Sequence, residues 1–283
     1  MNHIEQERAK LFEVVKLKLT SGLEGYTAEN AYGIFPKNGG KSLGLVGKDY
    51  FPTQSTLLFD NFVSAMSEVP KADLNSLKVT ELKEGKKCKI TCDLGLYGFV
   101  NMIGKDDEME VKIDIQTGWD GFTKTSIFLS TYRLVCSNGL KGWSTERIAS
   151  FKNTVGNNGK INILSEDVAK VLRGKDQYLE KLRLLNERKV SAKEVKDYLN
   201  RVLKIDTTKT LSTRTSNILD QINASVAIEE KNAGMTAFTL LNGITHYTNH
   251  VAKAKDRQTY LYSDRGMVLN DLAQKHAFDL ILN

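Results

Sequence analysis

The chain contains few of the residues that stabilise small secreted or fibrous proteins. It has three cysteines and three prolines in 283 residues. Three cysteines cannot build a disulfide framework, and three prolines exclude a proline-rich architecture. No apolar run reaches the ~18–20 residues that a membrane-spanning helix needs. The first residues include acids and lack the apolar segment of a signal peptide. We therefore expect a soluble, cytoplasmic protein without membrane contact.

The composition is otherwise that of a folded protein. Hydrophobic residues make up 41% of the chain and aromatic residues 8%, which excludes a disordered chain. The formal net charge is +6, and most of the positive excess falls in residues 160–283. A surplus of this size permits contact with a phosphate backbone, because affinity depends on how the cations cluster. The alternative is an ordinary solvated surface.

Hydrophobic patterning divides the chain into three regions and predicts the α+β class. Residues 1–70 carry N-terminal helices, expected over 4–19 and 53–66, around a glycine-rich loop. Residues 71–159 alternate apolar and polar side chains, which predicts an antiparallel β meander packed against helices. Residues 160–283 form a helical C-terminal third that either stands alone or forms one α+β domain with the meander.

The helical third carries one specific start signal. Ser191 and Glu194 have the spacing of a capping box, which predicts a helix over residues 191–203. Further helices are expected over 165–185, 212–230, 236–254 and 267–282.

Sequence signatures of common enzymes are missing, including phosphate-binding loops, nucleophile elbows and dinucleotide fingerprints. Cys88 and Cys92 share one face of an expected strand about 13 Å apart, too far to bind one metal ion. His246 and His250 have the i, i+4 spacing of a zinc pair, but no third ligand is evident. Cys136 needs a neighbouring base to act as a nucleophile. We name no catalytic residue, no metal ligand and no cofactor.

Residues 119–160 combine aromatic rings with cations. Rings that stack on bases and cations that follow the phosphates are how proteins bind single strands. The alternative is that several of these rings belong to a hydrophobic core, since the chain has only two tryptophans. The candidate nucleic-acid ligands are Trp119, Phe122, Arg133, Lys141, Trp143, Arg147, Lys152 and Lys160.

The same segment resembles a known family. Residues 119–125 (WDGFTKT) and 133–140 (RLVCSNGL) are similar to the paired signature of the phage and plasmid family called domain of unknown function 932. Residues 242–250 (NGITHYTNH) are similar to its Asn-x-x-Thr-x-Tyr-x-x-His helix, whereas Gly139 departs from the threonine of many members. We expect a structural role for the family-motif residues, which are Asp120, Gly121, Cys136, Asn138, Asn242, Thr245, Tyr247 and His250.

The resemblance implies a protein of phages or plasmids, compatible by analogy of fold with single-strand annealing proteins such as the RecT-like proteins. We therefore expect a non-enzymatic protein that binds single-stranded DNA and promotes annealing in recombination as a homo-oligomer. One alternative is a protein that binds a host or phage protein partner, such as a defence inhibitor. Another is an enzyme that uses Cys136 or the pair His246 and His250.

Overall fold

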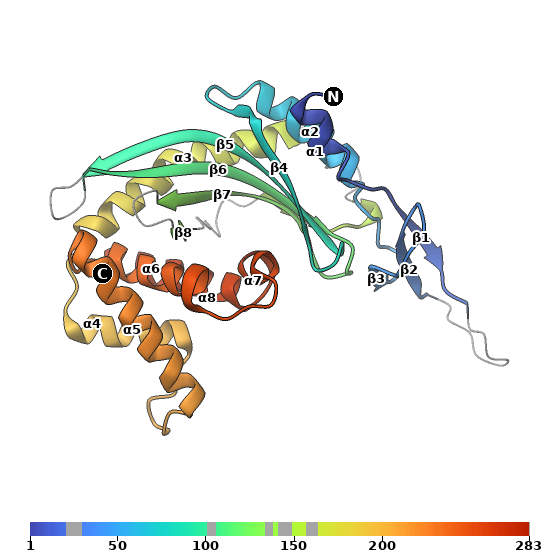
Figure 1. Ribbon diagram of the computed structural model, residues 1–283. Coiled ribbons are helices and arrows are strands. Elements are labelled where there is room, and N and C mark those ends of the chain that lie inside the picture. The colour runs from blue at the N-terminus through green and yellow to red at the C-terminus, as the bar shows by residue number, and fades with distance from the viewer. Residues whose placement is uncertain (21–29, 101–105, 134–137, 141–148, 157–163, 283) are drawn as a thin grey trace. The chain divides into compact units, whose positions relative to one another are not determined.

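The structure is a computed structural model that describes residues 1–20, 30–100, 106–133, 138–140, 149–156 and 164–282 (Figure 1). It contains two β-sheets and a set of helices concentrated in the C-terminal part, so the predicted α+β class is confirmed. No helix in these ranges is long and apolar enough to span a membrane.

The N-terminal region contains a small sheet with the strand order β1-β2-β3. The predicted helix over residues 4–19 is wrong beyond Arg8, because residues 14–18 form a strand that pairs antiparallel with β2. Lys16 holds this strand by donating from Nζ to the carbonyl oxygens of Lys48 and Tyr50 at 2.6 and 2.8 Å. The second predicted helix is confirmed as α2. The elements are α1 (His3–Arg8), β1 (Val14–Lys18), β2 (Tyr32–Pro36), β3 (Gly44–Val46) and α2 (Ser55–Ser67).

The larger sheet follows the chain, with the strand order β4-β5-β6-β7-β8, and this confirms the predicted antiparallel meander. In β6 the apolar residues Val111, Ile113 and Ile115 are fully buried, and the polar Asp114 and Gln116 between and after them are buried as well. Strands β8 and β9 both pair with β7, β9 near its start and β8 near its end. The strands are β4 (Asp73–Leu82), β5 (Lys87–Val100), β6 (Asp106–Gly118), β7 (Thr125–Arg133), β8 (Asn138–Leu140) and β9 (Ala149–Phe151).

The C-terminal third is helical as predicted. Ser191 and Glu194 form the predicted capping box at the start of α4. The predicted helix over 236–254 changes to a π-helix after His246, a departure that occurs frequently at functional sites. The elements are α3 (Leu164–Glu187), α4 (Ala192–Leu203), α5 (Thr213–Ala233), α6 (Ala237–His246), η2 (Tyr247–Val251), α7 (Arg257–Ser263) and α8 (Arg265–Leu282).

The chain folds into two compact units whose ranges interleave along the sequence. Unit 1 comprises Met1–Gly95, Lys112–Phe128 and Thr145–Arg173, and unit 2 comprises Leu96–Val111, Leu129–Ser144 and Gly174–Asn283. Unit 2 has a core of its own, in which Leu185, Leu199, Ile222, Leu241 and Ala273 come from five different helices. Burial of such side chains contributes about 1.5–3 kcal/mol each for the larger ones, so this core holds the helices together.

Candidate nucleic-acid interface

Trp119 follows β6 and anchors the turn between β6 and β7 in unit 1. Its side chain is fully buried, and Nε1 donates to the carbonyl oxygen of Thr53 at 2.9 Å. The indole packs against Phe12 with ring centroids 5.2 Å apart. A buried ring offers no face to a base, so we remove Trp119 from the candidate interface. The alternative interpretation, that this ring belongs to the hydrophobic core, therefore holds for Trp119.

Asp120 gives the turn its shape. Its Oδ1 accepts hydrogen bonds from the backbone N–H groups of Phe122 and Thr123 at 3.0 and 2.8 Å, and Oδ2 accepts from the Thr123 hydroxyl at 2.8 Å. Burial raises the pKa of Asp120, but these hydrogen bonds and the Lys87 ammonium, 3.6 Å from Oδ2, outweigh it and lower the pKa below its ordinary value. The charged carboxylate therefore has a structural role in the turn.

Gly121 and Gly44 let the turn lie directly against β3. Gly121 has a φ of +84°, and a Cβ added there would lie 2.9 Å from the carbonyl oxygen of Leu45. A Cβ added to Gly44 would lie 2.2 Å from the carbonyl oxygen of Trp119. Neither position has room for a side chain, so the two backbones meet without one between them.

Asn153 ties the turn to the rest of unit 1. Its buried Oδ1 accepts from the hydroxyls of Thr53 and Thr125 at 3.1 and 2.8 Å, and Nδ2 donates to the carbonyl oxygen of Gly118 at 3.1 Å. Nδ2 also lies 3.3 Å from the carbonyl oxygen of Thr123. Because Gly118, Thr123 and Thr125 belong to the β6–β7 hairpin and Thr53 precedes α2, the network ties the turn to the start of α2.

The turn ends in an exposed surface of apolar and basic side chains. Phe122 is 91% exposed and Leu45 is 67% exposed. The carbonyl oxygen of Lys86 accepts from the Trp119 N–H at 2.8 Å, which brings the β4–β5 turn alongside. The side chains of Lys86, Lys124 and Lys152 are exposed. We call Leu45, Lys86, Phe122, Lys124 and Lys152 the hairpin-tip surface.

Two of the eight predicted nucleic-acid ligands, Phe122 and Lys152, belong to this surface. Arg133 ends β7 opposite Asn138 of β8, and the structure describes the backbone of both residues. Lys141, Trp143, Arg147, Lys160 and the family-motif Cys136 lie outside the described residues. Sequence reasoning missed Leu45 and Lys86, and it placed Lys124 in the basic and aromatic segment without naming it as a ligand.

The second family motif lies in α6 and η2 of unit 2. Asn242 and Thr245 are fully buried and Tyr247 is nearly so. The Thr245 hydroxyl donates to the backbone carbonyl oxygen of Asn242 at 2.9 Å. The Asn242 amide finds no hydrogen-bond partner within the described ranges. These side chains therefore pack in the helical core without bonding to each other as a cluster.

His246 and His250 lie side by side at the end of this motif. Their ring centroids are 5.1 Å apart, and His246 Nδ1 lies 3.1 Å from the hydroxyl of Ser225. Burial lowers the pKa of His246, the charge of His250 lowers it further, and Glu229 acts in the opposite direction. In the part of the chain that the structure describes, no group of three His, Cys, Asp or Glu could hold a metal ion.

The two described cysteines are buried on β5. Burial raises the pKa of Cys88 to about 12 and that of Cys92 to about 11. Raised pKa values keep both thiols protonated at neutral pH, so neither offers the thiolate that a nucleophile needs.

Comparison with known proteins places most of the chain in one family. A model of the family described as Domain of unknown function (DUF932) matches residues 42–272. No curated protein and no solved structure matches the chain. The matched range includes the β6–β7 turn with its Trp-Asp-Gly-Phe sequence and the buried motif of α6. The chain therefore belongs to the DUF932 family.

Proposed function

We propose that the protein binds single-stranded DNA through the hairpin-tip surface. The observation that carries this proposal is the exposure of Phe122. In the sequence Trp-Asp-Gly-Phe, Trp119 is an anchor, Asp120 is a turn acceptor and Gly121 permits a close backbone approach. Phe122 is 91% exposed at the tip that these three residues hold in place. A rigidly presented ring is suited to stacking on a base, whatever the sequence of the strand.

The flanking lysines supply the cations that a single-strand site needs in addition to a stacking ring. Lys86, Lys124 and Lys152 surround the turn and can contact successive phosphates while Phe122 stacks. Glu84 belongs to the same turn as Lys86, so the surface is mixed, with cations in excess. A duplex keeps its bases stacked on each other, so a single exposed ring favours an unpaired strand.

We further propose that the bound strand is presented for annealing by several copies of the protein. Contacts through phosphates and one stacked ring leave the pairing edges of the other bases free for a complementary strand. One small surface covers few nucleotides, so a homo-oligomer would be needed to order a longer strand. The resemblance to phage and plasmid proteins supports recombination as the setting, and this reaction requires no nucleotide and no metal.

The test is fluorescence anisotropy with a labelled ~40-nucleotide single strand and the corresponding duplex, at low and high salt. We expect preference for the single strand and a binding constant that falls steeply with salt. Phe122→Ala should weaken binding about tenfold, because stacking contributes ~1–3 kcal/mol per base. Phe122→Trp should retain binding, because it keeps a stacking ring. Lys124→Ala should reduce the salt slope by about 0.7.

Lys193→Ala is the matched control, since Lys193 is an exposed lysine of α4 in unit 2. It should leave both the affinity and the salt slope unchanged. Salt-independent binding, equal binding of the duplex, or an unchanged affinity for Phe122→Ala would remove the hairpin-tip surface from DNA binding.

A further inference from the structure

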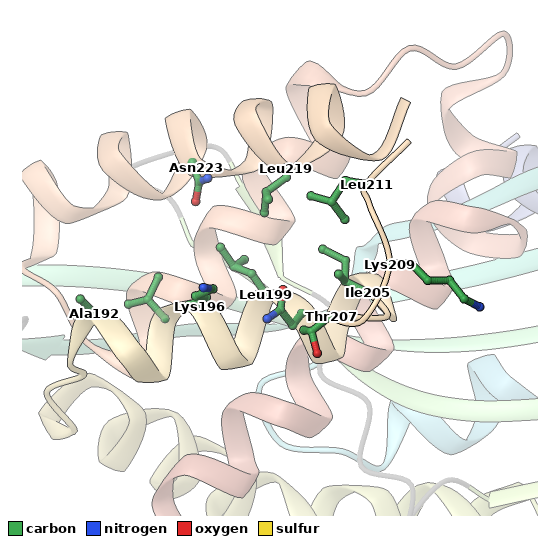
Figure 2. A pocket seen from close by; sticks show the side chains of 11 residues that line it. Ala192, Lys196, Leu199, Ile205, Thr207, Lys209, Leu211, Leu219 and Asn223 are labelled. Carbon is green, nitrogen blue, oxygen red and sulfur yellow. The ribbon is translucent and has the colours of Figure 1, made fainter. Parts of the chain in front are cut away.

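Helices α4 and α5 of unit 2 enclose an apolar groove of about 360 Å³ (Figure 2). Figure 2 shows Leu211 and Leu219 on one side facing Leu199 and Ile205 on the other. The volume lies in the range of about 300–1,000 Å³ typical of binding clefts. Leu211, on the loop between the two helices, is 38% exposed, so part of this apolar lining is open to solvent.

The apolar lining follows a helical stripe along α4. Ala192, Val195 and Leu199 recur at i, i+3 and i+7, and all three face the groove. Asn200 and Asn223 lie in the same lining and offer amide groups that can orient an occupant. An apolar groove between two helices can accept the apolar face of a third helix.

The charged residues that line the groove are basic. Its lining includes Lys196 and Lys209 and no acidic residue. Lys209 Nζ lies 3.1 Å from Asp206 Oδ2, but both side chains are exposed, and such pairs contribute little. On α4, Glu194 accepts hydrogen bonds from Ser191 and Arg188, and neither Glu194 nor Asp197 lines the groove. An occupant with acidic side chains beside its apolar face would therefore complement the groove.

We propose that this groove binds an acidic amphipathic helix of a partner protein. The leucines and Ile205 receive the apolar face of that helix, and Lys196 contacts its flanking carboxylates. The groove lies in unit 2 and includes no residue of the hairpin-tip surface. The proposal is therefore independent of DNA binding and adds a protein partner to the proposed function.

The probe is a fluorescein-labelled helical peptide of ~16 residues, with leucine at i, i+3, i+4, i+7 and i+11 and glutamate at the other positions. The comparison peptide has lysine in place of every glutamate. Titration with the full-length protein should give micromolar binding of the acidic peptide and binding of the basic peptide at least ~10-fold weaker. Lys196→Glu and Leu211→Glu should each weaken the acidic peptide about tenfold. Both replace exposed side chains, so the fold should tolerate them.

Lys193→Glu is the matched control, because it makes the same charge change one turn away on α4 at a residue that does not line the groove. It should leave the affinity within about twofold. Absence of binding, equal binding of the two peptides, or equal effects of Lys193→Glu and Lys196→Glu overturns the proposal. Sedimentation equilibrium provides a separate outcome. A dimer that Leu211→Glu converts to a monomer would assign the groove to a second copy of the chain and overturn the partner helix.

Discussion

At the residue scale, Trp119 and Phe122 lie three positions apart in one turn and have opposite environments. Trp119→Phe removes the donor to the Thr53 carbonyl and leaves that oxygen unsatisfied, so we expect a loss of about 1–3 kcal/mol in unfolding free energy. Phe122→Ala removes an exposed ring and should change the unfolding free energy by less than about 0.5 kcal/mol. Urea unfolding of the two variants and the wild type measures both values.

The comparison separates a structural aromatic residue from a binding one. Phe122→Ala should bind DNA about tenfold more weakly at unchanged stability, whereas the folded fraction of Trp119→Phe should bind with wild-type affinity. Equal destabilisation by the two substitutions would contradict the assigned environments.

Gly121 tests the backbone contact between the turn and β3. Gly121→Ala places a Cβ 2.9 Å from the Leu45 carbonyl oxygen at a φ of +84°. The left-handed conformation alone costs about 1–2 kcal/mol for a residue with a side chain, and the contact adds to this cost. Urea unfolding should therefore show a loss of more than about 1 kcal/mol. Gly47→Ala is the control, because Gly47 follows the same strand and a Cβ there meets no atom within 4 Å. A loss as large in Gly47→Ala would refute this account.

At the element scale, the start of α4 depends on a carboxylate that should make stability sensitive to acid. Hydrogen bonds from the backbone and side chain of Ser191, and then from Arg188, lower the pKa of Glu194 from 4.5 to about 2. A pKa lower in the folded state means stabilisation that is present above pH 4.5 and lost as the pH falls toward 2. When the pH is lowered from about 6 to about 3, the urea concentration at the midpoint of unfolding should therefore fall further for the wild type than for Glu194→Gln.

Asp197→Asn is the control for this difference, since Asp197 is an exposed carboxylate of the same helix. It should follow the wild-type pH dependence. If Glu194→Gln loses as much stability in acid as the wild type, the capping box makes no pH-dependent contribution.

Local patterns predict elements where the local signal and the packing agree. The alternation of Val111, Ile113 and Ile115 predicted β6, and Ser191 with Glu194 predicted the start of α4. The prediction failed at residues 14–18, where apolar spacing suggested a helix but pairing with β2 made a strand. That pairing joins residues about 18 positions apart, and its local signal, the alternation of apolar and polar side chains over residues 15–19, was outweighed by the helical spacing.

The hairpin-tip surface was only partly predictable, because some of its residues come from segments that are distant in the sequence. Phe122, Lys124 and Lys152 lie in a segment whose basic and aromatic composition was visible. Leu45 and Lys86 reach the surface only because β3 and the β4–β5 turn pack against Trp119 and Gly121. The sequence did not reveal the burial of Trp119 either, since a tryptophan in a basic segment can either stack on a base or fill a core.

At the scale of the whole molecule, the two units cannot be separated by one cut in the chain. Unit 2 takes residues 96–111 and 129–144 in addition to its helices. Within it, α6 contacts β8, so the buried face of α6 depends on a strand that precedes the helical third. The helical core itself lies between Tyr178 and Ile281. The shared helical core favours folding of the helical third when it is expressed alone. The contact between α6 and β8 would be missing from such a fragment.

We expect the fragment 174–283 to be helical but to self-associate. Its helices keep their shared core, whereas the face of α6 that contacts β8 becomes exposed, and exposed apolar surface of this kind promotes association. Circular dichroism should show a helical spectrum, and light scattering should show oligomers that bind a hydrophobic dye. The full-length chain, measured at the same concentration, should bind little dye. A monomeric fragment with a cooperative unfolding transition would show that the helical third is an independent domain. In that case the strands of unit 2 contribute nothing that the helices need in order to fold.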